Sequence, residues 1–283
     1  MGKGRDSMMG KKRAWIFFLL PSLGGVFVFV VCPFADVVRR SFLTAMTGQF
    51  VGLWNYRMVF GNMAFRTAMK NTFFFTAFCI PILVSFGLLV ALAISRVKHI
   101  RLLKSLYLFP MAMPTAAIVI VWKMLFYKQG FVNKYLQGQE TALMDYLGTE
   151  AAFYLLAGTY IWKNMGYTVT LWLAGLMGIS GEMLEAAKVD GAGRMQRLFY
   201  VLLPNLKGSM YIIVVLSFLN SFKIYREAYL VAGSYPHESI YMLQHLFNNW
   251  FVNLDLDKMA AAAVVCGAVF LAGILLLQRA WEQ

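Results

Sequence analysis

The chain has 283 residues, of which 60% are hydrophobic and only 14% are charged, and its mean hydropathy is +0.63. A soluble domain needs roughly 25% charged residues to cover its surface, so this composition excludes a soluble enzyme, a disordered protein and a secreted disulfide scaffold. The 26 Lys and Arg against 13 Asp and Glu are typical of membrane proteins, whose cytoplasmic loops accumulate basic residues. We therefore predict an all-α membrane protein and no nucleic-acid partner.

Six apolar segments follow one another along the chain, each long enough to cross about 30 Å of hydrocarbon as a helix. They are continuous rather than alternating every second residue, as the strands of a membrane barrel would. The predicted spans are 14–34, 70–95, 105–126, 152–177, 210–232 and 259–278. We expect 1–13 to be an N-terminal tail and 14–283 to be a six-span transmembrane domain.

The basic residues of the loops predict the orientation of these spans. Positively charged loops resist translocation, and one set of alternate segments carries Lys and Arg much more densely than the other. Both termini and the loop between spans four and five are therefore predicted to be cytoplasmic. Arg39 and Arg40 fall outside in this arrangement, against the trend. The predicted inside segments are 1–13, 96–104, 178–209 and 279–283.

The longest inside loop, 178–209, has the pattern of two short helices separated by a break. Ser180 is placed to cap the N-terminus of the first helix. Glu182 and Glu185 lie in its first turns, where the helix dipole favours anions. Gly191 suits a left-handed cap at its C-terminus.

The second half of this loop has its own signals. We expect Asp190 to accept backbone N–H groups at the start of the second helix, and Pro204 to end or kink that helix. Ala186 and Ala187 are small enough to let the first helix lie close against another protein. Apolar side chains in a cytoplasmic loop need either a partner or the bundle itself to cover them. These side chains belong to Met183, Leu184, Met195, Leu198 and Phe199.

The order of residues in this loop resembles the EAA loop of binding-protein-dependent ABC importer permeases. In that family the loop inserts into a cleft on a cytoplasmic ATPase and couples it to transport. Over the rest of the chain the resemblance is to a type I importer permease of the oligosaccharide kind, similar to sugar and glycerol-phosphate permeases. The matching residues are Glu185, Ala186, Ala187, Asp190, Gly191, Ala192, Leu203 and Pro204.

The resemblance implies the permease subunit of an ATP-driven carbohydrate importer in the bacterial cell membrane, working by alternating access. It implies a second homologous permease, two ATPase subunits and an extracytoplasmic solute-binding protein as partners, besides membrane lipid. The sequence has no G-x-x-x-x-G-K-[ST] phosphate loop, so ATP and Mg are expected on the partner ATPase, and the chain itself is neither an enzyme nor a cofactor protein. The alternative is a secondary transporter or channel without an ATPase, which leaves 178–209 without a role.

Polar side chains in the fourth and fifth spans are candidates for the substrate path, because such groups are costly inside a membrane. A mixture of amides, hydroxyls and aromatic rings suits a sugar, which has hydroxyl groups to bond and ring faces to stack. The alternative is that these groups bridge helices or meet the partner permease. Lys223 and Glu227 stand one turn apart, so we expect an ion pair. The candidates are Trp162, Lys163, Asn164, Tyr167, Asn220, Ser221, Lys223 and Glu227.

Overall fold

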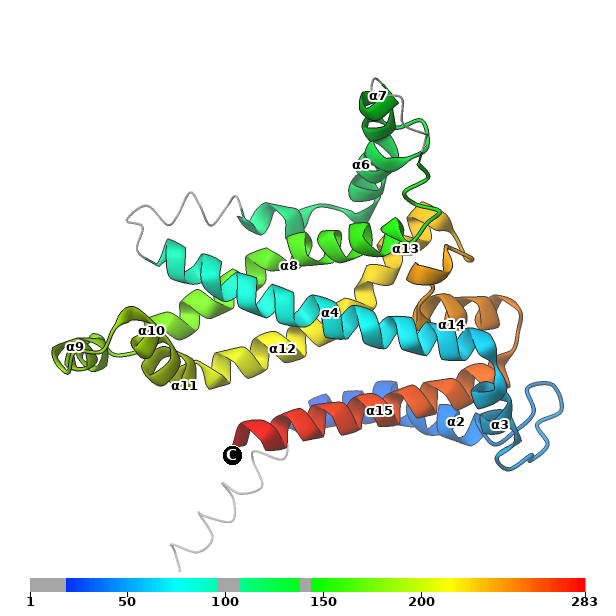
Figure 1. Cartoon of the computed structure of the whole chain (residues 1–283). Coiled ribbons are helices and arrows are strands. Elements are labelled where there is room, and N and C mark those ends of the chain that lie inside the picture. Colours follow the sequence, from blue (N-terminus) through cyan, green and yellow to red (C-terminus); the bar gives the residue numbers. More distant parts are fainter. Residues whose placement is uncertain (1–18, 96–106, 138–143, 283) are drawn as a thin grey trace, which may run out of the picture. The chain divides into compact units, whose positions relative to one another are not determined.

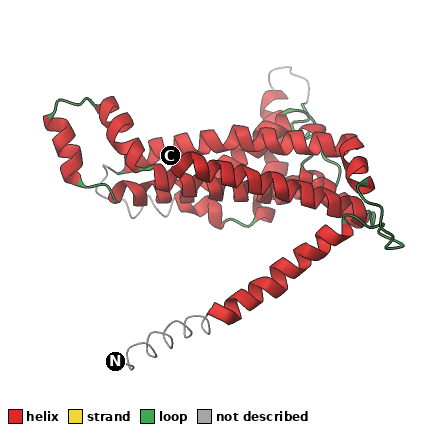
Figure 2. Ribbon diagram, turned by 90° about the horizontal axis from the view of Figure 1, so that it is seen from below, coloured by secondary structure: helices red, strands yellow, loops and turns green. Residues whose placement is uncertain are grey.

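The computed structural model describes residues 19–95, 107–137 and 144–282 (Figure 1). Within these ranges the regular structure is helical, apart from one isolated antiparallel bridge between Leu43 and Phe50 (Figure 2). The prediction of an all-α protein is confirmed.

Two parts of the predicted organisation lie outside the described residues. They are the N-terminal tail 1–13, with the first residues of the first span, and the inside loop 96–104. The division into tail and membrane domain stays a prediction.

The chain forms two compact units, which are described separately. The first comprises Met1–Asn62 and Trp250–Phe270, and the second comprises Met63–Asn249 and Leu271–Gln283. The helices of the first unit are η1 (Phe27–Val31), α2 (Cys32–Arg40) and α3 (Trp54–Gly61), with part of α15 (Leu256–Glu282).

The second unit contains most of the helices, and α14 and α15 each have residues in both units. Its helices are α4 (Met63–Ile94), α6 (Thr115–Phe126), α7 (Phe131–Gln137), α8 (Ala151–Met177), α9 (Gly181–Val189), α10 (Arg194–Arg197), η2 (Leu198–Leu202), α11 (Leu203–Asn205), α12 (Lys207–Ser221), η3 (Phe222–Ile224), α13 (Tyr225–Ala232), η4 (Glu238–Ile240) and α14 (Leu243–Val252).

Five helices in the described part of the chain are long and apolar enough to cross a membrane. They correspond to five of the six predicted spans. The fourth predicted span is helix α8, whose 27 residues also suffice in length, but polar side chains such as Lys163 and Asn164 lower its hydropathy. The number of six crossings therefore stays a prediction. The five helices are Leu19–Arg40, Met63–Ile94, Thr115–Tyr135, Lys207–Ala232 and Leu256–Arg279.

The third predicted span, 105–126, is not one continuous helix. Residues 107–112 are helical, the chain is extended at Pro114, and α6 starts at Thr115. Proline has no N–H to donate and its ring disfavours a helical conformation in the residue before it. The predicted span is therefore interrupted at Pro114, and the break gives α6 an N-terminus inside the bundle.

In the first unit, Asp36 lies beside Arg39 and Arg40, the two basic residues that the loop charges place on the predicted outside. Asp36 accepts hydrogen bonds from Arg39 Nη2 at 2.9 Å and from Arg40 Nε at 2.6 Å. These side chains are exposed, so the pairs contribute little to stability. Asp36 nevertheless offsets one of the two positive charges at this end of the first span.

In the second unit, α4, α8 and α12 pack side by side (Figure 1). Trp172 of α8 is fully buried, and its indole N–H donates to the carbonyl oxygen of Val84 in α4 at 3.1 Å. Phe75 of α4 and Tyr160 of α8 meet edge to face, with ring centroids 5.5 Å apart. These contacts hold α8 against its neighbours, although Lys163 and Asn164 lie near its middle.

One histidine of the second unit is part of the core. His245 in α14 is completely buried, with its ring 4.7 Å from that of Tyr225 and 5.7 Å from that of Tyr241. Its Nδ1 accepts the backbone N–H of Met242 at 3.2 Å. Burial lowers the pKa of His245 to about 4, because a cation is poorly solvated there. The imidazole is therefore neutral and structural.

The close approach of α8 to the 107–112 helix yields a stability prediction. A Cβ added at Gly166 would overlap the carbonyl oxygen of Tyr107, which is backbone and cannot turn aside. We expect Gly166→Ala to lower the free energy of unfolding by about 1–3 kcal/mol through overpacking. The measurement is thermal unfolding in detergent, followed with a thiol-reactive dye that reaches the buried Cys79 only after unfolding.

Gly158→Ala is the matched control on the same helix. No atom lies within 4 Å of a Cβ at this position, and alanine is the better helix former. The control variant should be as stable as the unmodified chain or slightly more so. Equal unfolding temperatures for the two variants would contradict the tight contact at Gly166.

Candidate functional site

Helix α9 begins as the sequence predicts. Ser180 is its N-cap, and the hydroxyl oxygen accepts the backbone N–H of Met183 at 3.4 Å. Glu182 lies in the first turn and Lys188 in the last turn, so both charges complement the helix dipole.

The C-terminus of α9 is closed by a Schellman motif. Gly191 adopts φ +81°, the left-handed conformation expected for it. The N–H of Ala192 donates to the carbonyl of Ala187 at 3.0 Å, and the N–H of Gly191 donates to that of Lys188 at 3.2 Å. These two bonds satisfy carbonyl groups that would otherwise lack partners at the helix end. Helix α9 is thus capped at both ends.

The expectation for Asp190 is wrong. Asp190 is the C-cap of α9, whereas the N-cap of α10 is Gly193. The N–H of Gly193 is instead bonded to Oε1 of Gln196 at 2.7 Å. The Schellman turn separates Asp190 from the second helix and leaves it exposed.

Pro204 disturbs the second helix, as predicted. The turn before it, η2, is π-helical, α11 lasts only from Leu203 to Asn205, and the α-helix resumes at Lys207. Because proline lacks an N–H, the carbonyl of Tyr200 has no i+4 donor, and a π-turn is one way for the backbone to adjust. We call residues 180–206 the coupling segment, after the role that the sequence resemblance predicts for them.

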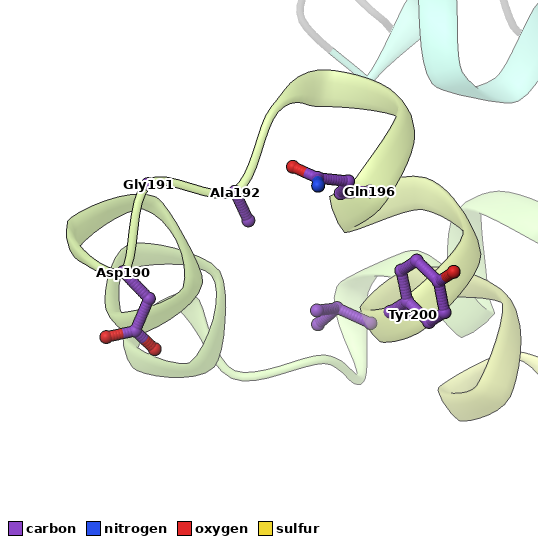
Figure 3. Close-up of a pocket in the computed structure, with 6 residues that line it drawn as sticks. Asp190, Gly191, Ala192, Gln196 and Tyr200 are labelled. Atoms are coloured by element: carbon purple, nitrogen blue, oxygen red, sulfur yellow. The ribbon is translucent and has the colours of Figure 1, made fainter.

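The coupling segment lies at one end of α8 and α12, opposite η3 and α13 (Figure 1). A hollow of about 280 Å³ separates its two helical parts, with Asp190 and Tyr200 at opposite edges (Figure 3). Several apolar side chains of the segment are exposed, so the bundle does not cover them. The exposed ones are Met183, Val189, Met195, Phe199 and Tyr200.

A second cavity, of about 180 Å³, lies between α6, α8 and the stretch from α12 to α13. It is near the middle of α8 and of the span Lys207–Ala232, and it contains five of the eight candidate path residues. Its lining residues are Met111, Thr115, Tyr160, Lys163, Asn164, Asn220, Lys223, Ile224, Arg226 and Glu227. We call it the polar cavity.

The ion pair of the polar cavity differs from the one predicted. Lys163 Nζ lies 2.5 Å from Oε1 of Glu227, whereas Lys223 Nζ donates to Oδ1 of Asn220 at 2.8 Å. The 3-10 turn η3 rotates Lys223 away from the position that an α-helix would give it relative to Glu227. The predicted pairing of Lys223 with Glu227 is therefore wrong, and Glu227 joins α13 to α8.

The other three candidates do not line the polar cavity. Tyr167 bonds the hydroxyl of Ser217 at 2.8 Å, and Ser221 donates to the carbonyl of Phe218 at 2.7 Å. Trp162 is 46% exposed. Tyr167 connects α8 to α12, which is the bridging role that the sequence left open as an alternative.

The structure also adds residues that the sequence analysis did not select. Arg226 is a charge within the fifth span, so the argument from the cost of polar groups applies to it as well, although it is not among the eight candidates. Thr115 follows a proline, and its hydroxyl donates to Oε1 of Glu227 at 3.3 Å. Its contribution depends on the break at Pro114, which hydropathy does not reveal.

Residues 84–282 match the family described as "Binding-protein-dependent transport system inner membrane component". The chain is 28% identical over 234 residues to the arabinooligosaccharides transport system permease protein AraP of Bacillus subtilis (strain 168), covering 80% of this chain and 74% of that protein. It is 24% identical over 275 residues to the sn-glycerol-3-phosphate transport system permease protein UgpA of Pectobacterium atrosepticum, covering 90% of each.

The fold is similar to that of a chain in the crystal structure of a bacterial ABC transporter involved in the import of the acidic polysaccharide alginate. The TM-score is 0.80 at 19% sequence identity, with 98% of each chain covered. The family match includes the whole coupling segment and every residue of the polar cavity. This chain therefore belongs to the family of binding-protein-dependent transport system inner membrane components.

Proposed function

We propose that this chain is the transmembrane permease subunit of an ATP-driven carbohydrate importer. It forms half of the translocation path in the bacterial cell membrane, with both termini in the cytoplasm. A second homologous permease forms the other half, two ATPase subunits dock below, and an extracytoplasmic solute-binding protein delivers the sugar. Family membership and the names of the relatives support this function.

The single observation that carries the proposal is the construction of α9. It is capped at both ends and joined to the next helix through the left-handed Gly191, and apolar side chains of the same segment are exposed. A short, rigid helix with such a surface suits insertion into a cleft on another protein. We assign this contact to the ATPase, with Glu185, Ala186 and Ala187 on the docking helix.

Coupling follows from the connectivity of the chain. The coupling segment is continuous with α8 on one side and with α12 on the other. Movement of the segment when ATP closes the ATPase pair is therefore transmitted along two helices that reach the polar cavity. Hydrolysis and product release then reset the cavity to its other orientation.

The polar cavity suits a carbohydrate, because it combines the amides of Asn164 and Asn220 with charged groups that can bond hydroxyls. Among the relatives, AraP is named for arabinooligosaccharides and MalF of Thermococcus litoralis for trehalose and maltose. These are neutral sugars. UgpA, in contrast, is named for glycerol-3-phosphate, so similarity alone leaves the charge of the substrate open.

The left-handed cap gives a test of coupling. Gly191→Ala places a side chain at φ +81°, which costs about 1–2 kcal/mol, so α9 should lose its fixed connection to α10. We expect several-fold less binding-protein-stimulated ATP hydrolysis by the reconstituted complex. Gly193→Ala is the matched control, since Gly193 has φ −64° and a Cβ there would meet only Oε1 of Gln196, at an ordinary contact distance of 3.5 Å. Unchanged stimulation in the Gly191 variant would refute the coupling role of the cap.

The charge of Glu185 gives a test of docking. Glu185→Lys should weaken co-purification of the ATPase, because it puts a cation where the partner meets an anion, while membrane insertion is retained. Glu182→Lys is the control, because Glu182 is nearer the N-terminus and matters more to the helix dipole. If the stability of α9 alone decided docking, Glu182→Lys would reduce co-purification of the ATPase more than Glu185→Lys does. That ranking would count against direct contact between Glu185 and the ATPase.

Asn220 gives a test of the substrate path. Asn220→Ala should reduce uptake of the sugar that stabilises the solute-binding protein by roughly fivefold, since a neutral hydrogen bond contributes about 1 kcal/mol. Asn220→Leu should reduce uptake further, because leucine also fills the cavity. The ATPase should stay attached in both variants.

The control for this test is Leu219→Ala, at an exposed neighbouring position on α12, which should transport normally. Normal assembly together with unchanged uptake in both Asn220 variants would remove this residue from the path.

A further inference from the structure

The charges of the polar cavity do not balance. Lys163, Lys223 and Arg226 are cationic, and Glu227 is the single acid among the lining residues. Glu227 is only 2% exposed and is paired with Lys163 at 2.5 Å. Two positive charges, those of Lys223 and Arg226, therefore remain without an anion from the lining.

Two acceptor atoms of the cavity are already engaged. Oε1 of Glu227 accepts from both Lys163 and Thr115. Oδ1 of Asn220 accepts from Lys223. These two oxygen atoms are therefore less available to a ligand that would donate to them.

Several donor atoms, in contrast, are unused. Lys223 has two further ammonium protons, and Asn220 still has its amide N–H₂ group. In the described part of the chain, Arg226 has neither a hydrogen bond nor an ion pair. Unpaired cations at membrane depth are unfavourable unless an anion or water compensates them. The cavity thus offers donors and positive charge together.

We propose that the imported carbohydrate is anionic and that Lys223 and Arg226 bind its acidic group. This proposal rests on the permease function proposed above and narrows its substrate class. The acidic group is a carboxylate, phosphate or sulfonate, whose oxygens accept several hydrogen bonds at once. The guanidinium of Arg226 presents paired N–H groups that match such oxygens, and Lys223 adds a second charge one turn earlier.

The test uses the complete transporter in proteoliposomes with ATP on the ATPase side and its solute-binding protein in excess. The probe is a mixture of neutral oligosaccharides, uronic-acid oligosaccharides, sugar phosphates and sugar sulfonates. Imported compounds are identified by mass spectrometry. The variants are Lys223→Gln with Arg226→Gln, the charge-conserving Lys223→Arg with Arg226→Lys, and Lys128→Gln, which removes an exposed cation far from the cavity lining.

We expect the unmodified complex to import an anionic class. The doubly neutral variant should import it roughly tenfold more slowly or worse, since hydrogen bonds to charged groups are the stronger ones. The charge-conserving variant should stay within a few-fold of the unmodified complex, and Lys128→Gln should be unaffected.

The contrary outcomes separate the two proposals. Import of neutral sugars only, or of anionic sugars at an unchanged rate by the doubly neutral variant, overturns the assignment of Lys223 and Arg226 and leaves the permease function intact. A third outcome is that the doubly neutral variant fails to assemble with the second permease, while the charge-conserving variant imports neutral sugars. The cations would then pair with the second permease, and the assignment of Lys223 and Arg226 to an anionic sugar would be overturned too. Import of no sugar by any complex overturns the carbohydrate function itself.

Discussion

A buried ion pair between Lys163 and Glu227 holds two helices of the second unit together. The side chain of Glu227 is 3% exposed and that of Lys163 is 19% exposed, so either charge alone would be costly there. Removing one partner of such a pair typically destabilises a protein by about 3–5 kcal/mol. The pair fixes α13 to α8, and the bond from Thr115 adds the N-terminus of α6. The polar cavity exists where these three helices are held together.

Helix α8 is the element that connects this interior to the coupling segment. Its middle carries Lys163 and Tyr160, its opposite face carries Trp172, and its C-terminus leads into the coupling segment. Tyr160 donates to the carbonyl of Ser217 in α12 at 2.5 Å. Tyr160 and Lys163 are therefore both bonded to neighbouring helices, as a low-dielectric environment favours. This explains how a helix with a lysine near its middle occupies a central place.

Local rules of sequence accounted for much of the coupling segment and less of the polar cavity. Ser180, Gly191 and Pro204 act through their own backbone neighbours, so capping and proline chemistry sufficed to predict them. Partners in the cavity depend on helix phase and on distant elements. The 3-10 turn η3 redirected Lys223 to Asn220, and Glu227 found its partner in a helix more than sixty residues away. Hydropathy located the spans but could reveal neither the break at Pro114 nor the outward direction of Trp162.

The π-helical turn at Leu198–Leu202 has a geometric consequence for the whole family of sequences that share it. Such a turn holds one residue more than an α-helical turn over nearly the same rise. Deleting one residue there would let the helix close with ordinary i+4 bonding, but everything before it would rotate by about 100° relative to α12. The number of residues between Gly191 and Pro204 therefore sets the direction in which α9 points relative to α12. Insertions and deletions in this stretch should be far rarer than substitutions.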